Sequence, residues 1–275
     1  MRSTRDIRSK IRTVRNIEQI CRAMKTVSSI RLRRAEQRLA GARPYHEKLA
    51  ELVGHLAAVT TDHPFLHDPP TGSTGLIVVT SDRGLCGGYN AAAVRAALAA
   101  AAPADTLAIA IGRRGAVHLR VQGYQIIDQM ALGGSPRVSE VSEMADRVGQ
   151  RYLEGEVAKL IVVYTQFLGG TRTKVRTDTI LPVQQAHVAA TDVIFEPAPA
   201  EMLPGLMRRY LRNEILAAVL ESATSEHAAR VAAMTAATDN AEEMIQRLTL
   251  DYNKARQAAI TTELTEIVSA AESAA

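Results

Sequence analysis

The stretch SDRGLCGGYN, residues 81 to 90, has residue types that suit three different roles, two of them chemical and one structural. Cys86 could act as a nucleophile if a base or a cation lay beside its thiol. The neighbouring glycines could cradle a phosphate, because the stretch follows an apolar run and precedes a helix-like segment. The same glycines could also supply the backbone angles and close packing of a tight turn.

The surrounding residues favour a structural turn. Arg83 is a nearby cation, but the nearest histidine in the sequence is His67, and thiols commonly pack as small apolar groups. The glycine spacing matches neither GxGxxG nor GxxxxGK[ST], and Asp82 would repel a bound anion. An enzyme that uses Cys86 or a nucleotide stays as the alternative. The residues assigned to the turn are Asp82, Arg83, Gly84, Cys86, Gly87 and Gly88.

Composition narrows the class of protein. The chain has 275 residues, of which 47% are apolar and 4% aromatic, and it contains no Trp. This predicts an aliphatic, alanine-rich core that suits closely packed helices. The two cysteines and seven histidines form no metal-ligand motif, so we expect neither a metal nor a cofactor. We also expect no membrane span and no signal peptide, and a reducing compartment.

The two ends of the chain carry opposite charge. Residues 2–38 contain twelve Lys or Arg against three Asp or Glu, whereas residues 214–275 contain ten acidic side chains against four basic ones. The basic run could bind nucleic acid, but it lacks aromatic residues for base stacking and any docking motif. The acidic end of the same chain is the simpler partner for it.

Apolar residues at steps of three and four predict that both ends are helices with a packing seam. Gly41 and Pro44 predict a kink in the first helix. Isolated helices as long as the predicted segments 1–60 and 201–275 need a packing partner, so we expect the two to form an antiparallel coiled coil. The first seam consists of Ile7, Ile11, Val14, Ile17, Cys21, Met24, Val27 and Ile30. The second consists of Ala241, Ile245, Leu248, Tyr252, Ala255 and Ala259, and continues through Leu264, Ile267 and Ala271.

The middle of the chain alternates strands and helices, which predicts a Rossmann-like, mostly parallel α/β domain. We expect strands at 76–80, 106–112, 124–128 and 159–167, an antiparallel edge strand at 173–183, and helices at 90–102, 113–121 and 138–153. The predicted organisation is an N-terminal coiled-coil helix at 1–60, a linker at 61–75, the α/β domain at 76–200, and a C-terminal helix at 201–275 that pairs with the first.

Three stretches together resemble the gamma subunit of F-type ATP synthases. They are IRSKIRTVRNIEQICRAMKTVSSIRLRRAEQRL, the loop TSDRGLCGGYN, and SEHAARVAAMTAATDNAEEMIQRLTLDYNKARQAAITTELTEIVSAA. The resemblance implies a central rotor shaft that couples proton flow to ATP synthesis and has no catalytic residue or cofactor of its own. It implies as partners the alpha and beta subunits, the epsilon subunit and the ring of c subunits, at the cytoplasmic side of a bacterial membrane.

The resemblance also assigns roles to single residues. Arg256 and Gln257 match the pair that meets the catch loop of beta, and Met24 matches the position that passes the beta lever. Glu196 resembles a foot residue near the c ring. A last group of residues would add polar contacts at the bearing: Thr262, Glu263, Thr265 and Glu266. The chain departs from the family pattern at Lys25, Thr26 and Thr235.

Overall fold

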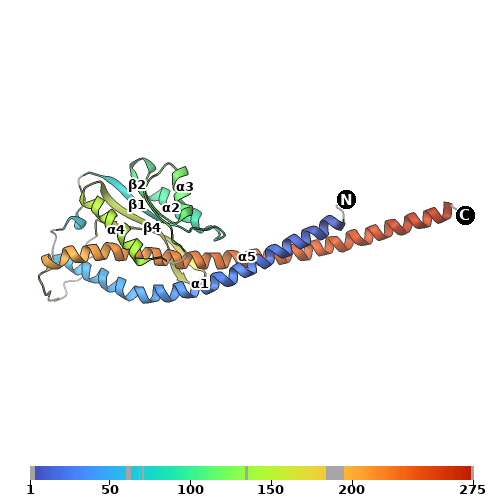
Figure 1. Ribbon diagram of the computed structural model, residues 1–275, viewed down its shortest axis with the longest axis horizontal. Helices are drawn as coiled ribbons and strands as arrows, with labels where there is room; N and C mark the ends of the chain where they lie inside the picture. Colours follow the sequence, from blue (N-terminus) through green and yellow to red (C-terminus); the bar gives the residue numbers. More distant parts are fainter. Residues whose placement is uncertain are drawn as a thin grey trace. The chain divides into compact units, whose positions relative to one another are not determined.

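The computed structural model describes residues 4–59, 63–67, 69, 71–133, 136–183 and 195–273, the last four without their side chains. The chain forms two compact units, one made of Met1–Val27 with Val231–Ala275 and the other of Ser28–Arg230. Two long helices, α1 (Thr4–Val59) and α5 (Pro199–Ser273), contribute to both units (Figure 1). None of the helices in the described part of the chain combines the length and the apolar character of a membrane span.

The unit Ser28–Arg230 contains a five-stranded sheet in the order β3-β2-β1-β4-β5. The first four strands run parallel and β5 pairs antiparallel with β4 at the edge, which confirms the predicted fold class. β1 starts three residues earlier than predicted because Ser73 already pairs with Val157 of β4. The strands are β1 (Ser73–Val79), β2 (Thr106–Ile111), β3 (Gln125–Met130), β4 (Val157–Gly169) and β5 (Arg172–Leu181).

Helices cover both faces of this sheet (Figure 1). The side chains of Ile77 and Ile109 pack on α1, α4 and α5, whereas those of Leu76 and Ala108 pack on α2 and α3. This alternation along each strand follows from the pleat of a sheet that is buried on both sides. The helices are α2 (Tyr89–Ala100), α3 (Arg113–Val121) and α4 (Val138–Leu153), with short 3-10 helices at Pro64–Leu66 and Pro103–Asp105.

Part of the segment that we expected to be a linker is packed in the core. Phe65 and Leu66 are buried in the cluster that holds α4 and α5 against the sheet. The Phe65 carbonyl also accepts a hydrogen bond of 2.8 Å from the backbone N–H of Val183. The Phe65 ring meets that of Tyr152 edge to face, with centroids 5.6 Å apart. These contacts anchor the chain between α1 and β1.

Inside the unit Ser28–Arg230, α1 and α5 pair in antiparallel directions. Arg43 forms an ion pair of 2.8 Å with Glu221. Further along α1, His46 Nδ1 lies 3.0 Å from Nδ2 of Asn213, which precedes Glu221 on α5. Burial lowers the pKa of His46, which favours the neutral imidazole in this contact. α1 is continuous as a helix through Gly41 and Pro44.

In the unit Met1–Val27 with Val231–Ala275, the same helices form a second paired segment. Ile7 and Ala241 are buried, and Arg22 pairs with Glu242 at 2.9 Å. The predicted seam is wrong at Ile17 and Val27, each of which is 50% exposed. The half-buried or buried positions are Thr4, Ile7, Ile11, Val14, Glu18, Cys21, Met24, Lys25 and Ser28, the last within the other unit.

The phase of the seam explains this difference. The covered positions repeat every 3.5 residues, as in a coiled coil, so the apolar residues that fall off this repeat face outwards. Ile30, in the other unit, is exposed for the same reason. On α5 the predicted seam is confirmed from Ala241 to Ala255 and wrong at Ala259, Leu264 and Ile267, which are exposed. The side chain of Ala271 lies outside the described residues.

Candidate functional site

The segment 81–88, called here the 81–88 turn, is closed by hydrogen bonds around Ser81. The Ser81 hydroxyl donates to the Arg83 carbonyl at 2.6 Å, and the Ser81 backbone N–H donates to Asn90 Oδ1 at 3.0 Å. Cys86 is buried, with its sulfur 3.7 Å from Ser81 Oγ and 3.4 Å from Asn90 Nδ2. The thiol therefore fills the inside of the turn, as the structural interpretation predicts.

Asp82 joins the turn to two other segments. One carboxylate oxygen accepts from the backbone N–H of Arg113, the first residue of α3, at 3.0 Å. The other accepts from the backbone N–H of Gly133, after β3, at 2.8 Å. A carboxylate at a helix N-terminus satisfies an amide that has no partner in the helix and interacts favourably with the helix dipole.

Thr80 and Gly112 fix the approach of this helix to the sheet. The Thr80 hydroxyl donates to the Ile111 carbonyl at 3.0 Å and accepts from the Gly115 N–H at 2.8 Å. Gly112 has φ +94°, and a Cβ at this position would overlap the Thr80 carbonyl oxygen. Gly112 is therefore required both for its backbone angle and for this close approach.

Arg230 ties the turn to α5. Its guanidinium group pairs with Glu226 at 2.8 Å and donates weakly to the carbonyls of Arg83 and Gly84, at 3.4 and 3.3 Å. The two charged side chains are only 8% and 12% exposed. Burial raises the pKa of Glu226 above its ordinary value, and the adjacent Arg230 acts against that shift. Each charge thus depends on the other for compensation in the interior.

α5 also occupies the place where a doubly wound sheet would hold a nucleotide. That place lies outside the carboxyl ends of β1 and β4, where the strand order reverses. Here Ser222 of α5 accepts from the backbone N–H of Thr165 at 3.3 Å and its hydroxyl lies 2.7 Å from the Tyr89 hydroxyl. Ser225 donates to the Thr165 carbonyl at 2.9 Å. The 81–88 turn therefore packs a helix rather than opening onto a ligand.

The residues expected to meet beta and to form the bearing lie on the last turns of α5. Every side chain at 256–269 is exposed, including the apolar Leu264 at 58% and Ile267 at 65%. The hydroxyls of Thr262 and Thr265 donate to backbone carbonyls four residues earlier. The same exposed segment contains Arg256, Gln257, Glu263 and Glu266.

The other two expected contact residues lie apart from that segment in the chain. Met24 is half-buried on α1, on the covered side of the helix pair. Glu196 is exposed just before α5 begins at Pro199. Their expected roles depend on subunits outside this chain, and they remain predictions.

Sequence reasoning missed the polar residues that hold the turn in place. Glu226 and Arg230 stand four residues apart, which is the spacing of an ion pair along one helix face. The apolar residues between and around them were a signal that this face is buried. The two bonds of Asp82 had no such signal, because they reach residues 31 and 51 positions away.

Comparison with known proteins identifies related chains over nearly the whole sequence. The family model described as ATP synthase matches residues 3–274. The chain is 40% identical to the ATP synthase gamma chain of Desulfitobacterium hafniense over 98% of this chain and 99% of the relative. It is 38% identical to that of Xanthomonas axonopodis, with the same coverage of each.

Solved structures show the same fold. A chain of the Euglena gracilis mitochondrial ATP synthase matches 98% of this chain and 94% of its own length, with a TM-score of 0.72 and 18% identity. A chain of the Tetrahymena thermophila mitochondrial ATP synthase central stalk and c ring matches 79% of this chain and 99% of its own, with a TM-score of 0.62 and 21% identity.

Proposed function

Because the chain belongs to the ATP synthase gamma family, the central-stalk rotor subunits of F-type ATP synthases, we propose that it transmits torque between the c ring and the hexamer of alpha and beta subunits. In this role it couples proton flow to ATP synthesis and is itself non-catalytic, since catalysis belongs to the beta subunits. Its further partner is the epsilon subunit, and the complex holds it at the cytoplasmic side of a bacterial membrane.

The exposed end of α5 is the observation that carries this proposal. Apolar side chains such as Ile260, Leu264 and Ile267 stand on a helix that has no cover from the described residues beyond Ala255. A helix of this kind gains little from propensity alone and is normally stabilised by packing. An exposed apolar segment of this extent indicates a partner surface. The hexamer of alpha and beta subunits supplies such a surface.

We also assign contacts with the other subunits to individual residues, on that surface and elsewhere in the chain. Arg256 and Gln257 meet the beta catch loop, and Met24 faces the beta lever. Glu196 lies at the foot near the c ring. The polar contacts of the bearing come from Thr262, Glu263, Thr265 and Glu266. The exposure of the α5 residues supports these roles, because a side chain must be accessible to meet another subunit.

The 81–88 turn has a mechanical role in this proposal. Torque passes between the α/β sheet and α5 only if the two are held together against shear. Tyr89 bonds the Ser222 carbonyl at 3.0 Å, and Arg230 reaches the turn from the same helix. These buried contacts fix the part of α5 within Ser28–Arg230 to the sheet.

The proposal is tested in the assembled complex with the double variant Arg256→Ala, Gln257→Ala. We expect ATP synthesis by reconstituted membranes to fall several-fold while alpha, beta and epsilon still co-purify with a tagged chain. Lys254→Ala is the matched control, because it also removes one exposed positive charge from α5. Unchanged synthesis in the double variant would contradict the contact with beta. A chain that co-purifies with none of these subunits would contradict the rotor function itself.

A further inference from the structure

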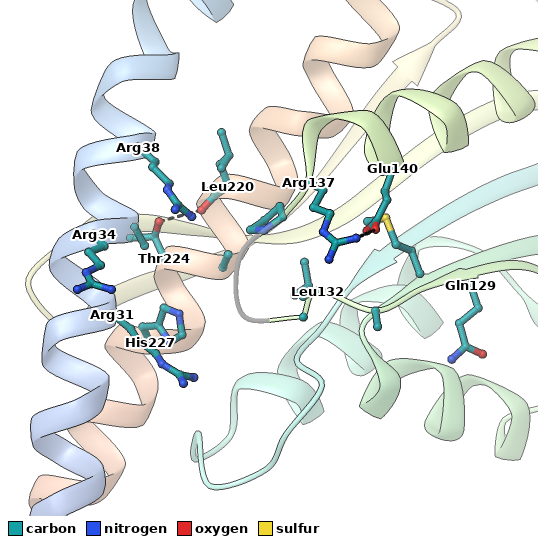
Figure 2. A pocket seen from close by; sticks show the side chains of 16 residues that line it. Arg31, Arg34, Arg38, Gln129, Leu132, Arg137, Glu140, Leu220, Thr224 and His227 are labelled. Carbon is teal, nitrogen blue, oxygen red and sulfur yellow. Dashed lines mark hydrogen bonds and ion pairs between the residues drawn. The ribbon is translucent and has the colours of Figure 1, made fainter.

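The unit Ser28–Arg230 contains a cavity of about 790 Å³ that the torque function does not use. It lies between α1, α5 and residues 129–133 and 136–140, at the end of β3 and the start of α4 (Figure 2). Its volume falls within the range of about 300–1,000 Å³ that is usual for small-molecule sites. The cavity is therefore large enough for a ligand of several non-hydrogen atoms.

Positive charge dominates the lining. Arg31, Arg34 and Arg38 stand on one face of α1 and reach the cavity together with Arg137, against the single carboxylate of Glu140 (Figure 2). Arg137 is paired with that carboxylate at 2.9 Å. Arg34 makes no hydrogen bond or ion pair with any residue in the described part of the chain. Arg34, on α1, therefore brings a positive charge without a direct partner to the cavity.

His227 adds a buried polar atom to the same lining. Its side chain comes from α5, is 6% exposed, and has an Nδ1 without a hydrogen-bond partner among the described residues. Burial, together with the positive charges of Arg230 and Arg31, lowers its pKa to about 4. The ring itself lines the cavity, so a bound group can approach the imidazole there.

We propose that this cavity is a binding site for a phosphate-bearing anion, held by the guanidinium groups of Arg31 and Arg34 and by the imidazole of His227. Arginine forks match the oxygens of phosphate in paired hydrogen bonds. A phosphate or pyrophosphate carries more than one negative charge, which suits several arginines better than a single carboxylate does. The site recognises the phosphate group itself, so free pyrophosphate and a nucleoside diphosphate should bind alike.

Calorimetry of the full-length chain with pyrophosphate tests the site directly. We expect saturable binding with one ligand per chain, weakened about tenfold or more by Arg34→Gln, which removes one charged donor. His227→Gln should weaken binding as well. Arg33→Gln is the matched control, because Arg33 is exposed on the same turn of α1 but does not line the cavity. The affinity of the Arg33→Gln variant for pyrophosphate should equal that of the unmodified chain.

Four results of these titrations would overturn the proposal. The first is the absence of saturable binding of pyrophosphate. The second is an equal loss in Arg33→Gln and Arg34→Gln, which would mean diffuse attraction to a basic helix. The third is binding of ADP without binding of pyrophosphate, and the fourth is tighter binding of an acidic peptide than of pyrophosphate. Cryo-electron microscopy of the assembled complex with tungstate, an electron-dense phosphate analogue, should show density between Arg34 and His227; an empty cavity at saturating tungstate would also refute the proposal.

Discussion

The same two helices are held in different ways in the two units. In the unit Ser28–Arg230, α5 is fixed by buried, directed contacts, such as the bonds of Ser222 to Tyr89 and Thr165 and the pair of Glu226 with Arg230. In the other unit, the ion pair of Arg22 with Glu242 is exposed, and α5 continues beyond its cover. Where α5 packs on other parts of this chain, specific buried contacts hold it. Where the proposed partner is another subunit, the surface of α5 is exposed in this chain.

The largest effect on stability should come from Gly112→Ala. The added Cβ would overlap the Thr80 carbonyl and the backbone angle would be strained, so we expect a loss of about 4 kcal/mol or failure to fold. Urea unfolding of the full chain measures it. Gly123→Ala is the control, because Gly123 also has a positive φ but nothing within 4 Å of an added Cβ, and it should cost only about 1 kcal/mol. Equal losses would show that the close approach to Thr80 is unimportant.

Arg230→Ala should have the next largest effect. It would leave Glu226 buried without its partner, at a cost of about 3 kcal/mol to the free energy of unfolding. Adding Glu226→Gln removes the unpaired charge and should recover much of that loss. If the double variant is no more stable than Arg230→Ala, the pair does not hold the turn through its charge.

Glu214 gives the α/β unit a pH dependence. Burial and the nearby Asp178 raise the pKa of Glu214 to about 7 from 4.5. The folded chain therefore keeps a proton that the unfolded chain releases between about pH 4.5 and 7, so this carboxyl lowers stability as pH rises through that window. Against Glu214→Gln, the unmodified chain should lose about 2–3 kcal/mol from pH 4.5 to 7.5.

The comparison with Glu214→Gln isolates this group from others that titrate nearby. Burial lowers the pKa of both His46 and His227, which gives the opposite trend, but these residues are present in both proteins. His46 Nδ1 lies 3.6 Å from the Glu214 carboxylate, so His46→Gln should be measured in parallel. A difference between the chain and Glu214→Gln that does not change with pH would show that Glu214 titrates normally.

The smallest effect is expected at the pair of Arg22 and Glu242. Both side chains are exposed, so Arg22→Ala should change the free energy of unfolding by less than about 1 kcal/mol. A loss as large as that of Arg230→Ala would erase the contrast between the two units. Thermal unfolding of the two variants side by side decides this.

Much of the fold could be predicted because its signals are local. The helices at Arg113–Val121 and Val138–Leu153 have the predicted bounds, and the parallel sheet with its antiparallel edge strand followed from alternating apolar runs. The seam was wrong at Ile17 because an apolar residue marks a covered position only when it stays in phase with the 3.5-residue repeat. Glu18, a charged residue, occupies the covered position instead.

The candidate site could be predicted less completely. The structural nature of the 81–88 turn followed from the position of Asp82 and the glycine spacing, but the partners of Asp82 lie far along the chain. The cavity around His227 gave no sequence signal, because its arginines stand in a helix where basic residues are common. The contacts proposed for Arg256 and Glu196 are with other chains, so no property of this sequence alone defines them.

The exposed end of α5 has a consequence for how much of this chain a cell can tolerate. In a free copy of the chain, residues 256–269 are accessible to proteases and to other apolar surfaces. If the proposed hexamer covers them on assembly, copies made in excess of alpha and beta would be degraded or would aggregate. Degradation would then help to set the stoichiometry of the complex.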